Sequence, residues 1–408
     1  MTDWKRHALS LVISETFAGE WGSDEKSDQI DVPCVRVADF NRETQRVADE
    51  VPTIRSYSEA KLASKQLKIG DILIEKSGGG EKTPVGSAIY FDGPEGLMCT
   101  NFIQVLRLRN GHDPRFWTYA LRMKYARGET YRLINQTTGI QNLDMREYFG
   151  QKFHIPDLET QRRIADYLDK EISEMDAMIE EFERLISSLE SRRGVYLQSK
   201  FDPEITGEPS LKMGTFAQIS LGKTFQGEPR EGQKDSFPVN YVRAANIQPH
   251  GQLVLDEQTM YATQDEVEKY TLKAGDVVIV EGGAGFGRSL TLQEDLPGWI
   301  FQNHVIRLIP RSGWLGEFFD YTIRAHLYSG YIELQTVGAT IPGLSSERAA
   351  NLPVAFVTLE EQQKRVIEAR EELDRMDSLI EESTRLIANL KARKTALITE
   401  LVTGRKEV

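Results

Sequence analysis

The chain has 408 residues, which is enough for two or three domains with ordinary hydrophobic cores. Its 40% hydrophobic and 27% charged residues suit a soluble globular protein, and no apolar run approaches the roughly 18 residues of a membrane span. The net charge of −12 weighs against strong unaided DNA affinity, because nucleic-acid binders usually carry a basic surface.

The two cysteines and six scattered histidines provide neither a disulfide framework nor the spacing of metal ligands. The N-terminus carries only a short apolar run, so a secretory signal is not expected. Composition therefore predicts a cytoplasmic protein with no metal site and no contact with a membrane.

Residues 1–156 are expected to form a strand-rich globular domain. Short apolar segments are broken by Gly, Pro, Asp and Asn, as is typical of strands joined by turns. In chain order the pattern predicts a strand at residues 35–40, a turn entering a strand at 67–74, a Gly-rich loop at 77–84, a strand at 105–108 and a helix at 116–131.

Residues 157–202 are predicted to form one long helix. Apolar residues recur at alternating steps of four and three for about four heptads, which is the seam of a coiled coil. Asp157 stands at the N-cap position, and Asp202-Pro203 ends the helix. A helix of this length spans roughly 60 Å, which is long for a globular core, so it is expected to act as a spacer.

The second half repeats this order, with residues 203–352 matching the globular segment and 353–408 matching the long helix. Strand counterparts lie 200 to 207 residues later, whereas helix counterparts keep a fixed offset of 201, and the polar interruption Arg193 recurs as Lys394. Loops have therefore diverged while the helices have not. We expect the two helices to pair within one chain; a coiled coil between two chains is the alternative.

The predicted fold class is α+β: two duplicated strand-rich domains separated by two long antiparallel coiled-coil helices, with pseudo-twofold symmetry. Two domains related in this way are suited to contact two separated segments of a DNA duplex, whose backbone is itself close to twofold symmetric.

Signatures of catalysis are absent from the sequence. Gly282 to Ser289 has the Gly spacing of a phosphate-binding P-loop, but Arg288 stands in the Lys place and a strand, not a helix, is expected next. Motifs of amino-methyltransferases, metal-dependent nucleases, serine hydrolases and zinc proteases are also missing. A Gly-rich loop that approaches a nucleic-acid backbone is the better interpretation.

Several polar and basic residues are candidates for DNA contact. Arg36 and Arg243 occupy matching places, which indicates either a phosphate contact or a shared internal ion pair. Polar loops rich in Gln, Asn and Thr precede each long helix, and these residue types contact base edges, although they are also ordinary loop residues. The candidates are Arg36, Lys76, Ser77, Gly79, Lys82, Thr83, Asn101, Gln136, Thr138, Gln141, Lys223, Arg243, Asn246, Gly283, Arg288, Ser289, Asn303, His304 and Thr340.

Over nearly its whole length the chain resembles the DNA-specificity subunit of type I restriction–modification systems. The resemblance rests on a Leu-Lys-x-Gly-Asp turn at residues 67–71 and 272–276, the Gly-rich loop after it, and a Pro-x-Leu-x-x-Gln helix start. It implies two target recognition domains, each binding one half of a bipartite site in double-stranded DNA. It also implies that the long helices dock methyltransferase subunits, which recruit a motor-nuclease subunit.

The same resemblance implies that this chain is not an enzyme and holds no cofactor. S-adenosylmethionine, ATP and Mg are then expected in the partner subunits. Two alternatives are the specificity chain of a related system that binds a combined nuclease-methyltransferase, and a coiled-coil scaffold without a role in DNA binding. The residues expected to dock partners on the helices are Gln161, Arg162, Arg193, Glu361, Gln362 and Lys394.

Overall fold

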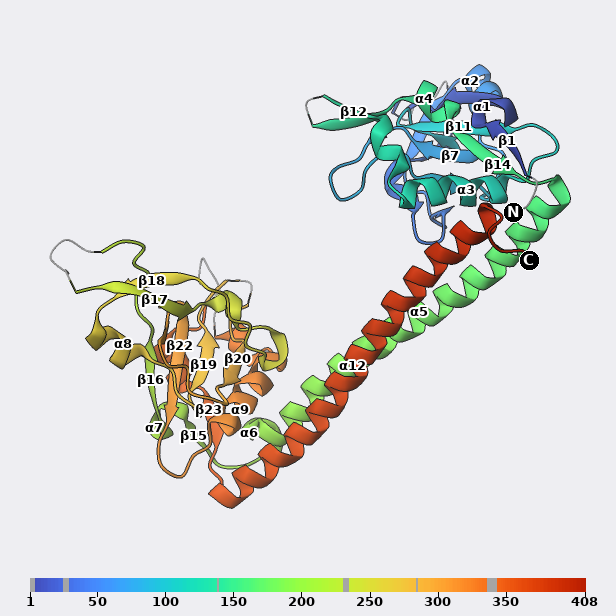
Figure 1. Cartoon of the computed structure of the whole chain (residues 1–408). Coiled ribbons are helices and arrows are strands. Elements are labelled where there is room, and N and C mark those ends of the chain that lie inside the picture. The colour runs from blue at the N-terminus through green and yellow to red at the C-terminus, as the bar shows by residue number, and fades with distance from the viewer. Residues whose placement is uncertain (1–3, 25–28, 138, 230–234, 284, 336–342) are drawn as a thin grey trace. The chain divides into compact units, whose positions relative to one another are not determined.

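The computed structural model describes the chain except for residues 1–3, 25–28, 138, 230–234, 284 and 336–342. The chain divides into two compact units: unit 1 is Met1–Phe182 with Thr384–Val408, and unit 2 is Glu183–Ser383. Each unit contains one strand-rich globular domain and part of both long helices (Figure 1). We call the globular parts domain 1 and domain 2 and describe each unit by itself.

Domain 1 is built on a four-stranded antiparallel sheet with the order β2-β11-β7-β9. Side chains alternate between its two faces, as the pleat of a strand requires. Ile72 and Ile74 pack with the aromatic residues of helix α3, whereas Leu73 lies in a second apolar cluster. The strands are β2 (Ile13–Ala18), β11 (Ile103–Leu108), β7 (Ile72–Glu75) and β9 (Ala88–Tyr90), and the helix is α3 (Pro114–Ala126).

Smaller sheets complete domain 1. The first strand pairs with the last, so the domain begins and ends beside the start of the first long helix. The remaining elements are β1 (Lys5–Ala8) with β14 (Lys152–Ile155); β10 (Met98–Cys99), β3 (Ile30–Val35) and β6 (Ile54–Tyr57); β12 (Ile134–Thr137), β13 (Ile140–Leu143) and β8 (Ser77–Gly78); β4 (Phe40–Asn41) with β5 (Arg46–Val47); and the helices α1 (Leu9–Val12), η1 (Val37–Asp39), α2 (Glu59–Lys65), η2 (Glu129–Leu133) and α4 (Met145–Gly150).

Domain 2 repeats this plan around the sheet β16-β22-β19-β20, which α9 covers on one face. Its strands are β16 (Ala217–Leu221), β22 (Val305–Pro310), β19 (Val277–Val280) and β20 (Ser289–Thr291); β18 (Thr259–Ala262), β17 (Phe237–Val242) and β21 (Trp299–Phe301); and β15 (Ser210–Lys212) with β23 (Pro353–Ala355). Its helices are α6 (Pro203–Thr206), α7 (Met213–Phe216), η3 (Ala244–Asn246), η4 (Pro249–Gly251), α8 (Gln264–Tyr270), α9 (Gly316–Tyr328), α10 (Tyr331–Leu334) and α11 (Ser346–Asn351).

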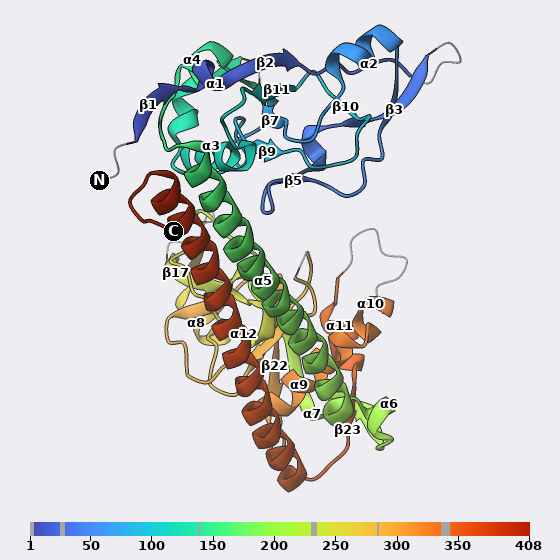
Figure 2. The same ribbon diagram turned by 90° about the vertical axis from the view of Figure 1, so that its right-hand side faces the viewer.

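The long helices are α5 (Leu158–Phe201) and α12 (Leu359–Val402), close to their predicted bounds. They are antiparallel partners within the chain: Asp176 contacts Lys394 in unit 1, and Arg193 contacts Asp377 in unit 2, so numbers rise along one helix as they fall along the other (Figure 2). This confirms the intrachain pairing.

The strand predicted at residues 35–40 is wrong except for its first and last residues, Val35 and Phe40. Strand β3 ends at Val35, and residues 37–39 form a single 3₁₀ turn. The backbone N–H of Arg36 donates to the Asp39 carboxylate at 2.8 Å, and Arg243 donates in the same way to Asn246 at 2.8 Å. A side-chain acceptor three residues ahead stabilises a turn against an extended strand, whatever the apolar pattern favours.

Candidate nucleic-acid interface

A hollow of similar construction lies in each domain. In domain 1 it measures about 810 Å³ and in domain 2 about 610 Å³. Arg36 and Arg243 line the two hollows at matching places, and the turn before the central strand β11 or β22 supplies another wall. The remaining lining is Glu20, Trp21, Gly22, Val37, Ala38, Thr100, Asn101 and Phe102 in domain 1, and Ala244, Ala245, Glu281, Gly282, Gly283, Gln302, His304, Gly343 and Ser345 in domain 2.

A glycine makes each hollow possible by letting two backbones approach closely. A Cβ on Gly19 would lie 2.3 Å from the carbonyl oxygen of Thr100, and one on Gly222 would lie 2.3 Å from that of Phe301. No side chain fits at such a distance, so glycine is required where β2 and β16 pass the turn. This pair was not predicted from the sequence, although both glycines directly follow equivalent strands.

The two arginines form internal ion pairs, as one of the two alternatives predicted. Arg36 contacts Asp39 at 2.9 Å, and Arg243 contacts Asp256. The hydrogen bond from Arg243 holds the pKa of the Asp256 carboxyl below its usual range. The arginine side chains are still 38% and 37% exposed, so their guanidinium groups remain accessible beside the hollows.

The Gly-rich loop of domain 1 belongs to a projecting ribbon. Strand β8 pairs with β13, and the Ser77 hydroxyl donates to Asn142 Oδ1 at 2.7 Å. The hairpin β12–β13 extends from the body of domain 1 (Figure 1) and exposes Asn135, Gln136 and Asn142. A two-stranded ribbon of this kind fits the major groove of DNA, where amide side chains contact base edges.

Other candidates near this ribbon differ in their accessibility. Lys82, Thr83, Gly79 and Asn101 are exposed. Lys76 is half-buried, and burial lowers its pKa. Thr138 lies outside the described residues, as does Thr340 in domain 2.

In domain 2 the Gly-rich loop leads into strand β20, which agrees with the rejection of a P-loop. Gly283 and His304 are exposed, and Asn303 and Arg288 are half-buried. His304 lies 3.4 Å from the Glu281 carboxylate across the rim of the hollow.

Four expected DNA contacts are wrong because their side chains are buried and bonded within the chain. Lys223 contacts Glu266 at 2.5 Å, and the Ser289 hydroxyl donates to Asp320 at 2.6 Å. The other two are Gln141, which accepts from the backbone of Val85, and Asn246, which accepts from that of Arg243.

Gln161 and Gln362 are also not partner-docking residues, because each is only 1% exposed. Gln161 Oε1 accepts from the backbone N–H of Asp113 at 3.0 Å, and Gln362 Oε1 accepts from that of Leu315 at 3.1 Å. Each glutamine therefore joins the first turn of a long helix to the start of α3 or α9. The helix-start motif of the sequence has this structural role.

Arg193 and Lys394 are buried between the long helices, where they contact Asp377 and Asp176. Burial between α5 and α12 leaves these cationic groups no surface for a partner, so the docking prediction is wrong for them as well. Arg162 is exposed and Glu361 is half-buried, and their role in docking stays a prediction.

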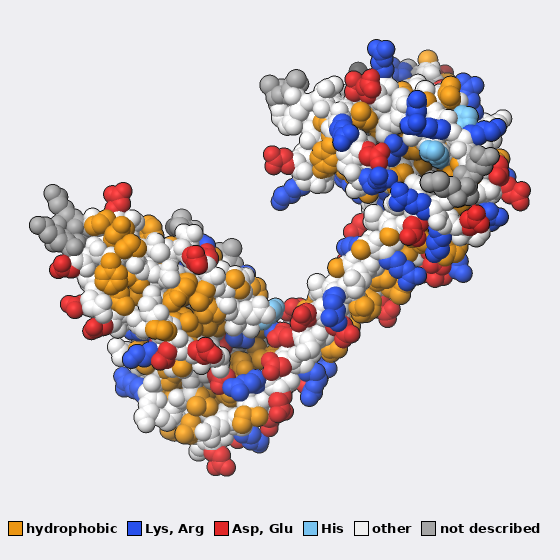
Figure 3. All heavy atoms as spheres, viewed as in Figure 1, with side chains coloured by type: hydrophobic (Ala, Val, Ile, Leu, Met, Phe, Trp, Pro, Cys, Tyr) orange, Lys and Arg blue, Asp and Glu red, His pale blue; other side chains and the backbone are white. Residues whose placement is uncertain are grey.

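The surface of domain 2 offers apolar contacts besides polar ones. Hydrophobic side chains gather over β17 and β18 (Figure 3), and Phe237 of β17 is among the exposed aromatic residues. Phe225 is also exposed, and its ring lies 5.8 Å from that of Tyr241. Side chains of this type can contact the methyl group of thymine.

Two matched α+β domains, each with an arginine-lined hollow and each joined to an antiparallel helix pair, define a duplicated two-site binding protein. The sequence model of the type I restriction modification DNA specificity domain matches residues 13–183 and again residues 210–392. The chain belongs to this family, and it is a DNA-recognition subunit.

Solved structures agree in fold. The HsdS subunit from Thermoanaerobacter tengcongensis is 14% identical, with a TM-score of 0.56 over 99% of this chain and 97% of that one. A chain from a structure described as "Structural basis underlying complex assembly and conformational transition of the type I R-M system" is 15% identical, with a TM-score of 0.68 over 99% and 98% of the two chains. No curated protein matches the sequence.

Two features are missing from the described residues. None of their helices combines the length and apolar character needed to cross a membrane. Within the same residues, no group of three or more His, Cys, Asp or Glu side chains is placed to hold a metal ion.

Proposed function

We propose that domain 1 and domain 2 each bind one half of a bipartite target in double-stranded DNA. The observation that carries this proposal is the duplicated hollow, with an accessible arginine at the same place in each domain. A guanidinium can contact phosphate or form two hydrogen bonds with guanine, and the neighbouring backbone amides can contact phosphate. The exposed amides of the β12–β13 ribbon would add base contacts in one half-site.

The test compares Arg36→Ala with Arg243→Ala in the full chain together with its methyltransferase. Each variant should weaken the footprint over one half-site and leave the other unchanged, and each should reduce the salt dependence of binding if a phosphate contact is lost. Lys364→Ala, exposed on α12, serves as a control. Equal weakening of both half-sites by both variants would contradict two separate recognition domains.

We further propose that α5 and α12 dock methyltransferase subunits, which recruit a motor-nuclease subunit. Exposed apolar residues recur at matching places, with Met178 and Leu185 on α5 answered by Leu379 and Leu386 on α12. Apolar side chains left on the surface of a paired helix are typical of a protein contact. Their duplication favours two copies of the same partner.

Exchange of these apolar residues for serine tests the docking surface. Met178→Ser with Leu185→Ser should release one methyltransferase copy, and Leu379→Ser with Leu386→Ser should release one copy as well, measured as the mass of the complex. Val195→Ser, at another exposed apolar position of α5, is the matched control. A complex of unchanged mass in all variants would reject this surface.

In this proposal the chain itself has no catalytic activity, and S-adenosylmethionine, ATP and Mg bind to the partner subunits. Methylation or cleavage by the purified chain, lost on mutation of its own residues, would contradict it.

A further inference from the structure

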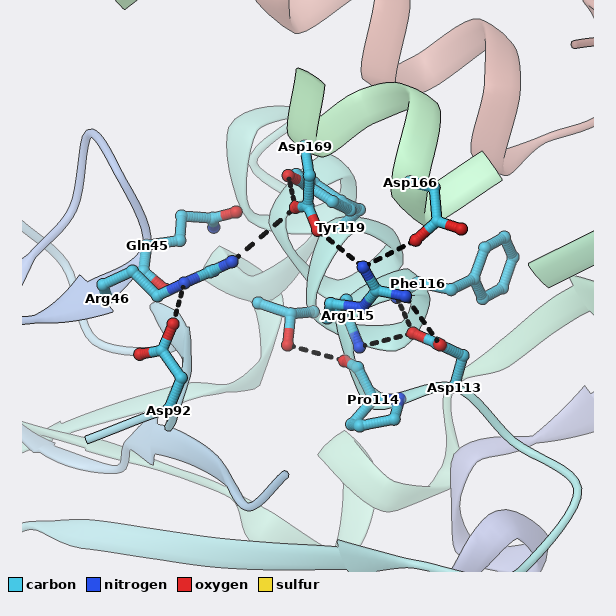
Figure 4. A network of polar contacts seen from close by, with 11 residues as sticks. Gln45, Arg46, Asp92, Asp113, Pro114, Arg115, Phe116, Tyr119, Asp166 and Asp169 are labelled. Atoms are coloured by element: carbon cyan, nitrogen blue, oxygen red, sulfur yellow. Dashed lines mark hydrogen bonds and ion pairs between the residues drawn. The ribbon is translucent and has the colours of Figure 1, made fainter. Parts of the chain in front are cut away.

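Domain 1 meets α5 through two arginines, each also paired with an aspartate of the domain, that face two aspartates of the helix. Arg115 of α3 contacts Asp169 of α5 at 2.9 Å and Asp166 at 2.8 Å (Figure 4). Arg46 lies 3.6 Å from Asp169, and the Tyr119 hydroxyl donates to the same carboxylate at 2.6 Å. We call the contact between a domain and its long helix a joint. In the joint of domain 1 the cation of each pair is on the domain, and the anion is on the helix.

Domain 2 makes the corresponding contact with the charges reversed. Glu317 of α9 stands where α3 has Arg115, and Arg370 of α12 stands 201 residues after Asp169. Arg370 Nη2 lies 2.5 Å from Glu317 Oε1. Here the anion is on the domain and the cation is on the helix.

A second pair of matching contacts has an anion on the domain in unit 1 and a hydrogen-bond donor on the domain in unit 2. In unit 1, Glu43 in the loop between β4 and β5 contacts Lys391 of α12 at 3.6 Å. In unit 2, His250 occurs 207 residues after Glu43, and its Nε2 lies 3.2 Å from Glu190 of α5, the counterpart of Lys391. His250 Nδ1 faces the Tyr328 hydroxyl at 3.4 Å, which leaves Nε2–H to donate to Glu190.

The contacts between the two helices show no such reversal. Arg193 and Lys394 occupy one matching position, and their partners Asp377 and Asp176 occupy another. The glutamines that join each helix to α3 or α9 are also the same in both copies. Helix pairing alone would therefore accept either domain at either section of the helix pair.

We propose that the reversed contacts assign each domain to its own section of the helix pair. If the domains exchanged places, Arg115 would face Arg370 and Glu317 would face Asp169. In the loops, Glu43 would face Glu190, and the donor His250 would face the cation Lys391. Each section of the helix pair is thus a docking surface that accepts one domain and rejects the other.

Rejection of the wrong domain is more important here than the strength of the right contact. A single exposed ion pair contributes little to stability, because solvent screens it. Like charges that face each other at short distance are unfavourable, and specific interfaces commonly use such repulsion against the wrong partner. Three of the four exchanged contacts would set like charges together, and the fourth would set a histidine N–H against a lysine. Covalent connection already holds each domain beside its own helix start, so this discrimination acts when a domain is transposed or exchanged.

The first test keeps the native order and changes one joint. Glu317→Arg should lower the melting temperature of unit 2 by about 2–4 °C, which is the shift expected when a segment of this size loses about 1 kcal/mol of unfolding free energy. Arg370→Asp should do the same, and the double variant, which has the polarity of the first joint, should recover to within about 1 °C. Lys364→Asp, an exposed change of the same charge on the same helix, is the control. No recovery in the double variant overturns the proposal.

The second test exchanges residues 5–155 and 210–355 in a full-length chain. With native helices, this transposed chain should melt below the native protein. Four further changes, Asp169→Arg, Arg370→Asp, Glu190→Lys and Lys391→Glu, should restore the melting temperature. A transposed chain that is as stable as the native one without them contradicts the assignment. If neither transposed chain folds, the recovery measured in the native order decides.

Discussion

The two hollows have the same framework but different walls. In both domains the residue that follows strand β7 or β19 donates its backbone N–H to a carbonyl oxygen in the turn before β11 or β22. In domain 1 Lys76 donates to Phe102 at 2.8 Å, and in domain 2 Glu281 donates to His304 at 3.0 Å. The framework therefore places a lysine and a phenylalanine in domain 1 where domain 2 has a glutamate and a histidine. Trp21 adds a second aromatic wall to the first hollow, with the Arg55 guanidinium 4.5 Å from its ring centre.

This difference teaches that the duplication preserved the scaffold and changed the contact chemistry. Apolar and aromatic walls favour methyl groups and base faces, whereas a carboxylate and an imidazole favour hydrogen-bond donors and acceptors on base edges. The two domains are thus suited to different half-sites.

The largest loss of stability is expected from substitution of the two glycines, Gly19 and Gly222, whose backbone lies against the turn. Gly19→Ala and Gly222→Ala each place a Cβ against a backbone oxygen, so the strand must move. Each should cost about 3 kcal/mol or more of unfolding free energy and abolish binding to one half-site. Gly80→Ala, which meets no atom within 4 Å, is the control. Denaturant unfolding of the three variants measures this; a neutral Gly19 or Gly222 variant would show that the close approach is not required.

The buried aspartates of the Leu-Lys-x-Gly-Asp turns should rank next and should differ between the domains. Asp71 accepts from the Lys68 backbone at 2.8 Å and contacts Arg107 at 2.9 Å, whereas Asp276 lies 4.0 Å from Arg307. Asp71→Ala leaves a nearly buried arginine without this partner and should cost about 2 kcal/mol, against about 1 kcal/mol for Asp276→Ala.

The comparison of these two variants is made by urea unfolding at neutral pH. Asn replacements serve as controls, because an amide oxygen can still accept from the backbone N–H. Equal losses in both domains would mean that the arginine contact adds nothing to the turn.

This turn illustrates what the sequence could predict. Gly70 and Gly275 have φ of +92° and +85°, so the motif contains glycine for a left-handed backbone and aspartate to close the turn. Both features are local and recur in each copy. The long helices were predicted for the same reason, since their heptads depend on spacing alone.

Accessibility could not be predicted, because it depends on distant residues. Buried Ser289 donates a hydrogen bond to Asp320, 31 residues away in the sequence, and buried Lys223 donates one to Glu266, 43 residues away. Nothing near these residues in the chain distinguishes them from exposed loop residues. The roles of Gln161 and Gln362 were equally hidden, although the same amide at the same place in two copies is a signal of a shared structural contact.

Exchange of the differing walls tests the comparison directly. His304→Phe gives the second hollow the ring of the first, and Phe102→His does the opposite. Both side chains are exposed, so stability should change little, while base preference at one half-site should change about tenfold, or about 1.4 kcal/mol. Methylation mapping of a randomised target measures this preference. A change in neither half-site would place the base contacts elsewhere, for example on the β12–β13 ribbon.

The smallest difference is expected in the response to pH, and it depends on His326 of α9. This side chain is fully buried, and its Nε2 lies 2.8 Å from the Pro353 carbonyl oxygen. Burial lowers its pKa, although the Pro353 contact and the nearby Asp202 carboxylate oppose this effect. At the matching place in domain 1, Lys124 contacts Glu129 at 2.9 Å, so domain 1 has no histidine there.

Because the folded pKa of His326 lies below the unfolded value of about 6.5, the unfolded state binds more protons as pH falls through that value. Unit 2 should therefore lose up to about 1 kcal/mol of stability per pH unit below pH 6.5, until the folded histidine also protonates. His250, whose pKa is lowered by burial as well, contributes in the same direction. Hydrogen exchange at pH 7.5 and pH 5.5 reports the unfolding free energy of each unit and so measures how the two units differ in their response to pH. His326→Gln should reduce the pH dependence of unit 2, and a variant with the full dependence would assign it to other groups.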